Sequence, residues 1–206
     1  MGVTIHYKGK IKKKEDVDLL AAEIADFAGT LGWEYELWRE DWSQPNTARL
    51  DRTLDDVRLV GHIPLRGISL HPHKSSETLS LTFNPDGYLV DAWGMVLLAE
   101  EELTLEKSWL GIKTQFAPIE IHIAIIKLFK YLKKRYMPDL EVHDDGGYWK
   151  SENVNELIHR IEKINRALNQ IEDALTADSP NLSGSKSVEE IANRIEEILR
   201  KKFGDL

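Results

Sequence analysis

The sequence feature that most constrains the fold is an apolar seam near the C-terminus. Six aliphatic side chains recur there at steps of four and three residues, which keeps them on one face of an α-helix. Acidic residues precede basic ones by four positions beside the seam, as in Glu156 and Arg160. A helix of this kind is stabilised by pairing its seam with another helix. The seam consists of Leu157, Ile161, Ile164, Leu168, Ile171 and Leu175.

A second run of the same kind follows a turn-rich segment at residues 177–186. Ser187 and Glu190 have the spacing of a capping box, and so do Asn153 and Glu156 at the start of the first helix. We therefore predict a helical hairpin over residues 151–206, which serves packing or dimerisation, with its helices paired either within one chain or between two. The predicted interface adds two residues of the second run to the seam, Ile191 and Ile195.

Composition limits the class of protein. The formal net charge of -8 and the isoelectric point near 5.4 argue against a protein that mainly holds nucleic acid, because phosphates require a basic surface. The absence of cysteine excludes disulfides, thiolate nucleophiles and cysteine-ligated zinc, and it fits a reducing compartment. The most apolar window, residues 119–132, is too short and too lysine-rich to span a bilayer. We therefore expect a cytoplasmic protein that binds neither nucleic acid nor membrane.

Residues 1–150 alternate between strand and helix patterns. Val3, Ile5 and Tyr7 alternate with polar residues, which is typical of a half-buried strand. Three-four spacing predicts amphipathic helices from Val17 to about Gly32 and from Pro118 to shortly before Pro138. Further strands are predicted at residues 33–37, 57–70, 109–116 and 140–149, the last interrupted or ended by a pair of glycines. Residues 43–56 are predicted to form a long loop.

One hairpin is predicted from its turn. Asn84-Pro-Asp-Gly87 has proline at the second position of a type I turn and glycine at the left-handed position, so residues 79–83 and 88–97 are expected to pair. The fold class is therefore α+β: a mixed, largely antiparallel sheet of about six to eight strands with two helices on one face, followed by the C-terminal two-helix hairpin. The predicted domain boundary lies at residue 150.

The best candidate site is the segment from Val142 to Trp149. Carboxylates, an imidazole and a phenol surround a glycine turn there at the end of a predicted strand, and such groups bind divalent ions or share acid and base roles. Lys113 and Gln115 end another strand just before a helix N-terminus, which would complete a cleft if the two strands were neighbours. The candidate ligand-binding residues are Lys113, Gln115, His143, Asp144, Asp145 and Tyr148.

Other constellations carry less information. His62, His71 and His73 would hold a metal only if the strand register brought them together, and we expect no metal and no cofactor. The sequence has no glycine-rich nucleotide motif and no nucleophile elbow. The favoured function is binding or assembly, with the C-terminal helices mediating self-association or docking. The alternative is a metal-assisted or hydrolytic enzyme with a cleft between residues 113–115 and 143–148.

Overall fold

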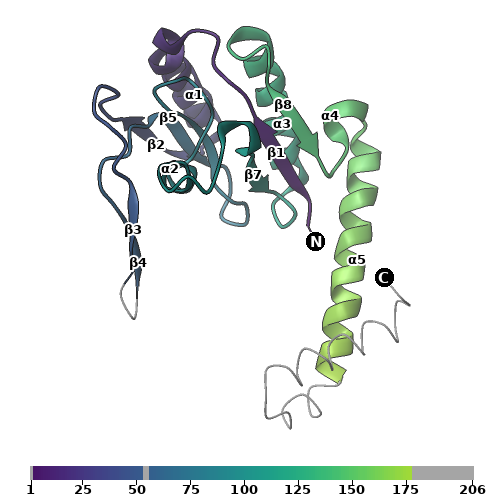
Figure 1. The fold of residues 1–206 in the computed structure, drawn as a ribbon. Helices are drawn as coiled ribbons and strands as arrows, with labels where there is room; N and C mark the ends of the chain where they lie inside the picture. The colour runs from purple at the N-terminus through teal and green to yellow at the C-terminus, as the bar shows by residue number, and fades with distance from the viewer. Residues whose placement is uncertain (1, 53–55, 178–206) are drawn as a thin grey trace, which may run out of the picture. The chain divides into compact units, whose positions relative to one another are not determined.

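The computed structural model describes residues 2–52 and 56–177 (Figure 1). The chain divides into two compact units, an α+β unit of residues Gly2–Leu157 and a second unit that begins at Ile158. The predicted boundary at residue 150 lies seven residues before this division, because the first turn of the C-terminal helix belongs to the α+β unit. The second predicted tail helix, with Ile191 and Ile195, lies outside the described residues.

Eight strands, five α-helices and two short 3-10 helices, Lys14–Asp16 and Leu105–Lys107, are described. The helices are α1 (Val17–Leu31), α2 (Ala92–Ala99), α3 (Ile119–Arg135), α4 (Tyr148–Ser151) and α5 (Val154–Ala177). The strands are β1 (Thr4–Lys8), β2 (Glu34–Arg39), β3 (Arg49–Arg52), β4 (Val57–Val60), β5 (Arg66–His71), β6 (Leu79–Phe83), β7 (Leu110–Lys113) and β8 (Glu141–Asp144).

The strands form three small sheets, and the prediction of one sheet of six to eight strands is wrong. Their orders are β7-β1-β8, β2-β5-β6 and β3-β4, and every pairing is antiparallel. Between the two larger sheets, the described residues form two isolated bridges, Lys10 with Tyr88 and Phe83 with Leu89. The stretch after the turn at Gly87 is too short to form a strand, because a helix begins at Ala92. The two larger sheets therefore stay separate.

Each larger sheet has its own helix. Tyr7 of β1 packs on Phe129 of α3 with ring centroids 4.7 Å apart, so α3 covers the β7-β1-β8 sheet. Arg66 of β5 pairs with Asp18 of α1 at 2.6 Å, which places α1 on the β2-β5-β6 sheet. The prediction placed both helices on one face of a single sheet. In the structure they lie on two different sheets (Figure 1).

The periodic predictions for β1, α1 and α3 are confirmed. Val3, Ile5 and Tyr7 are fully buried, whereas their neighbours Thr4 and His6 are partly exposed. Helix α1 ends at Gly32, whose φ of 69° is the left-handed conformation that glycine adopts without strain. Pro118 caps the N-terminus of α3, where its missing N–H has no cost.

The predicted hairpin is confirmed at its turn and for the first residues of its second arm, where Leu89 bridges Phe83 and Val90 donates its N–H to the carbonyl of Thr82. Gly87 donates its N–H to the carbonyl of Asn84, and its φ is 83°. The prediction that this arm continues to residue 97 is wrong, because residues 92–99 form α2. The Asp91 side chain accepts the N–H of Gly94 at 2.7 Å and so caps this helix. An apolar run of this length is compatible with a buried strand or a buried helix, and the cap decides for the helix.

Two further segments differ from the predictions. The stretch 43–56, expected to be a loop, contains β3, which pairs with β4. Strand β8 ends at Asp144, and the aromatic pair Tyr148 and Trp149 begins α4 rather than continuing the strand. Gly147, with a φ of 76°, makes this change of direction possible.

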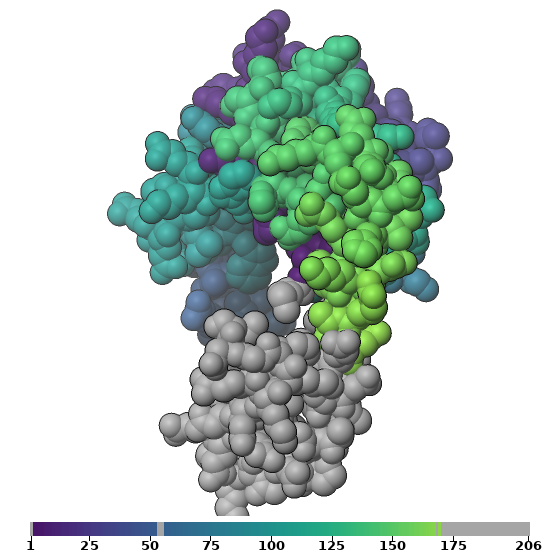
Figure 2. All heavy atoms as spheres, turned by 90° about the vertical axis from the view of Figure 1, so that its right-hand side faces the viewer, coloured from purple at the N-terminus to yellow at the C-terminus, as the bar shows by residue number. Residues whose placement is uncertain are grey.

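Helix α5 begins as predicted. Asn153 accepts the N–H groups of Asn155 at 3.0 Å and Glu156 at 3.3 Å through its side-chain oxygen, which is the N-cap geometry. Leu157 in the first turn is fully buried within the α+β unit. Figure 2 shows the light-green residues around α4 and this first turn on the molecular surface. No helix in the described part of the chain is long and apolar enough to cross a membrane.

Candidate functional site

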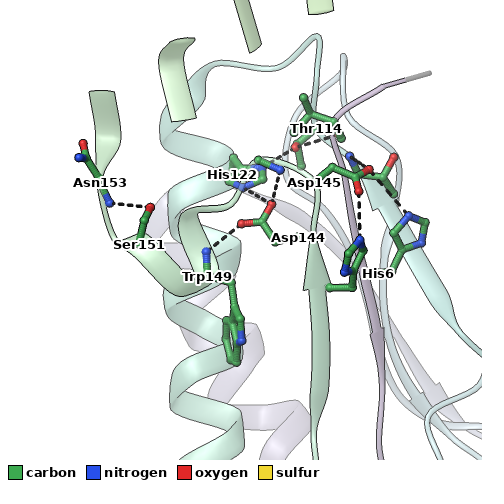
Figure 3. A network of polar contacts seen from close by, with 12 residues as sticks. His6, Thr114, His122, Asp144, Asp145, Trp149, Ser151 and Asn153 are labelled. Carbon is green, nitrogen blue, oxygen red and sulfur yellow. Dashed lines mark hydrogen bonds and ion pairs between the residues drawn. The ribbon is translucent and has the colours of Figure 1, made fainter. Parts of the chain in front are cut away.

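The side chains of the last residue of β8, Asp144, and of the next residue, Asp145, point to opposite sides of the sheet. Asp144 points toward α3, and Asp145 points to the other side, toward His6 (Figure 3). This follows from the alternation of side chains along a strand. The predicted site residues are therefore divided between a buried cluster and an outer face.

The buried cluster is Thr114, His122 and Asp144. Thr114 Oγ1 lies 2.8 Å from His122 Nδ1, and His122 Nε2 lies 3.1 Å from Asp144 Oδ1. The side chains of His122 and Asp144 are each 1% exposed. Asp144 also accepts the backbone N–H groups of Gly146 at 2.7 Å and Trp149 at 2.8 Å. The cluster thus links three segments by polar contacts: the end of β7, the first turns of α3 and the turn after β8.

The pKa of Asp144 is lowered below its ordinary value. Burial alone would raise the pKa, but the hydrogen bond and charge of His122 and the N–H groups of Trp149 and Gly146 outweigh that effect. The carboxylate is therefore ionised in the interior. A buried carboxylate is tolerated there only because its oxygens are hydrogen-bonded.

A chain of hydroxyl, imidazole and carboxylate is also the arrangement that activates a nucleophile in hydrolases. Thr114, however, is 1% exposed and His122 is fully buried, so a substrate could not reach the hydroxyl. In this structure the cluster connects three segments of the core and is closed to substrates. Asp144 is among the predicted site residues, whereas Thr114 and His122 are not, because a single polar residue between apolar ones is their only sequence signal.

Two other predicted site residues, Gln115 and Tyr148, are buried. Gln115 is 3% exposed and Tyr148 is 7% exposed, close to the values of core residues. A Cβ on Gly2 would lie 2.8 Å from Gln115 Oε1, so the N-terminal segment crosses over the glutamine. Neither side chain is accessible enough to line an open cleft.

The outer face of the β7-β1-β8 sheet carries Lys113, His143 and Asp145. Strand β1 lies between β7 and β8, so Lys113 and Asp145 are both cross-strand neighbours of Thr4 and not of each other. His143 Nε2 lies 3.5 Å and His6 Nε2 lies 3.9 Å from the carboxylate oxygens of Asp145. The central strand thus adds Thr4 and His6, which sequence analysis missed because strand order cannot be deduced from local patterns. Lys113, His143 and Asp145 thus share one face of the sheet, with Thr4 and His6 of β1 between Lys113 and the other two.

The three histidines considered for metal binding contact different partners. His62 lies near Glu40, His71 contacts Thr78, and His73 accepts the N–H of Ser75. Within residues 2–52 and 56–177, no three His, Asp or Glu side chains are grouped as metal ligands.

The seam residues lie along α5. Leu157 is fully buried in the α+β unit, whereas the next seam residues belong to the second unit. Ile161 and Ile164 are half-buried, and the intervening Glu162 and Lys163 are exposed. The side chains of Leu168, Ile171 and Leu175 lie outside the described residues, although the helix backbone continues to Ala177.

Comparisons of the chain with protein-family models, curated proteins and solved structures found no match.

Proposed function

We propose that this chain is a binding or assembly protein whose C-terminal helices mediate self-association or docking. The observation that carries the proposal is the length of α5 beyond its anchor. The helix has 24 residues, and only its first turn, with the buried Leu157, belongs to the α+β unit. At 1.5 Å per residue, the remaining turns extend for about 30 Å.

The amphipathic pattern of those turns supports association. Ile161 and Ile164 follow Leu157 at steps of four and three, and the sequence repeats these steps at Leu168 and Ile171. Burying an aliphatic side chain contributes about 1.5 to 3 kcal/mol, so the five seam residues after Leu157 would contribute roughly 8 to 15 kcal/mol before the entropy cost of ordering. This energy is sufficient to hold two helices together.

The enzyme alternative has less support. The only hydroxyl–imidazole–carboxylate cluster described is sealed in the core of the α+β unit, and the residues proposed for a cleft lie on both sides of a sheet. Catalysis requires the reacting groups to reach a bound substrate. Binding therefore accounts better for the described geometry.

Light scattering on the full chain tests self-association. The wild-type mass should rise above the monomer value of 23.6 kDa as concentration increases. An Ile161→Asp, Ile164→Asp variant should stay at the monomer mass, because each aspartate places a charge in the seam. A Glu162→Lys, Lys163→Glu variant changes the exposed face without altering net charge, and it should behave as wild type. A wild-type chain that is monomeric at every concentration would contradict self-association.

A further inference from the structure

We propose that the outer edge of β2 binds an extended, basic peptide segment of a partner protein as an added antiparallel strand. Strand β2 is the last strand in the order β2-β5-β6, and within the described residues no strand pairs with its second edge. It is six residues long and pairs with β5 along its whole length. An unpaired edge presents backbone N–H and C=O groups that another strand can satisfy. This surface is distinct from α5, so the inference goes beyond the proposed function.

The face of β2 beside α1 leaves apolar area uncovered. Tyr35 lies opposite Leu70 and Leu37 lies opposite Ile68, so the four side chains share one face of the sheet. The α1 side of the sheet is identified by Arg66, two residues before Ile68, whose guanidinium reaches Asp18. Ile68 and Leu70 are fully buried, but Tyr35 is 46% and Leu37 is 36% exposed. An added strand with aliphatic side chains on this face would extend the apolar layer over both residues.

The charge of the edge indicates which partner it fits. Residues 34–41 contain four carboxylates, those of Glu34, Glu36, Glu40 and Asp41, and a single guanidinium, that of Arg39. Glu34 and Glu36 are exposed on the face opposite Tyr35 and Leu37. A partner strand with lysine or arginine opposite the glutamates and aliphatic residues between them would complement both faces.

The same charges disfavour a second copy of β2 as the occupant. If two copies of β2 paired as antiparallel strands with their apolar faces on the same side, the pairing would be symmetric about one residue. Centring on Tyr35 places Glu34 opposite Glu36, and centring on Glu36 places Glu36 opposite itself. Centring on Leu37 or Trp38 places Glu34 or Glu36 opposite Glu40. Like charges directly opposite one another are destabilising, and charged edges are a known protection against self-pairing. The occupant is therefore a different, basic segment.

The probe is a short fluorescein-labelled peptide of alternating lysine and valine, titrated into the full chain at low salt and followed by fluorescence anisotropy. We expect saturable binding. An otherwise identical peptide with N-methyl groups on alternate backbone amides cannot donate the ladder hydrogen bonds, and it should bind at least about tenfold more weakly, which is about 1.4 kcal/mol. A peptide with glutamate in place of lysine should not bind.

Variants of the full chain locate the site. Glu34→Lys, Glu36→Lys should weaken binding at least about tenfold. Glu15→Lys, Glu120→Lys makes the same change in net charge at exposed positions outside β2, and it should bind the peptide as wild type does. The Ile161→Asp, Ile164→Asp variant should also bind normally, so a failure of this proposal is distinguishable from a failure of the α5 proposal.

Three results would overturn the inference. Equal binding of the N-methylated peptide would mean that charge alone attracts the probe. Absence of binding to the unaltered chain would mean that the edge does not accept a basic strand. A Leu37→Lys variant with a lower mass than wild type in light scattering would mean that a second copy occupies the edge.

Discussion

Replacing Asp144 with asparagine should destabilise the α+β unit severely. The side chain is 1% exposed and accepts from the N–H groups of Gly146 and Trp149, with His122 at 3.1 Å. Asparagine keeps the shape but has one accepting oxygen, so its amide nitrogen must face a donor. Hydrogen bonds to a charged group contribute about 1.5 to 3 kcal/mol each, and removing one member of a buried pair costs about 3 to 5 kcal/mol. We expect a loss of about 3 to 5 kcal/mol in the free energy of unfolding.

The assay is equilibrium unfolding in urea, followed by tryptophan fluorescence at neutral pH. Asp145→Asn is the matched control, because Asp145 is the next residue, is 32% exposed and lies on the outer face. We expect this control to cost about 1 kcal/mol or less. A double variant with His122→Asn should cost clearly less than the sum of the two single variants, because the two residues act as a pair.

The reasoning would be refuted if Asp144→Asn cost no more than Asp145→Asn. It would also be refuted if the Asp144 and His122 variants were additive. Either result would mean that the buried carboxylate and imidazole do not stabilise each other.

Two further predictions concern the same cluster. The folded-state pKa of Asp144 is lowered from 3.8, so its stabilising contribution is present above that value and is lost as the pH falls through the lowered pKa. In acid, the free energy of unfolding should therefore fall more steeply with pH for wild type than for Asp144→Asn. Parallel pH profiles of the two proteins would contradict this. Gly146→Ala should lower the unfolding free energy by about 1 to 3 kcal/mol, because its Cβ would lie 2.6 Å from Leu157 and 3.0 Å from Asp144 Oδ1. Gly29→Ala, at an exposed position of α1 with no atom within 4 Å of the new Cβ, should instead be stabilising by up to about 1 kcal/mol. Equal effects of the two substitutions would exclude the steric explanation.

Local patterns predicted the elements whose signals are themselves local. The three-four spacing of α1 and α3, the alternation in β1, the turn at Gly87 and the cap at Asn153 all depend on residues within a few positions of one another. Such features are determined by short-range sterics and hydrogen bonds. They can therefore be read from a single sequence.

The sheets could not be predicted in the same way. That β1 lies between β7 and β8 depends on contacts between residues more than a hundred positions apart, such as Thr4 with Lys113 and with Asp145. The same strand order determines that the Asp144 side chain contacts His122, whereas the His143 side chain lies on the outer face of the sheet. Helix α2 was missed for another reason, because its apolar run has no periodicity to separate a buried helix from a buried strand.

Hydrogen exchange of the α5 backbone tests the central proposal most directly. If the seam mediates self-association, the amides after Leu157 should become more protected as protein concentration rises, while those of β1 and α3 do not change. The Ile161→Asp, Ile164→Asp variant should lose this dependence on concentration. Exchange in α5 that is the same at all concentrations, in wild type and variant alike, would contradict the account.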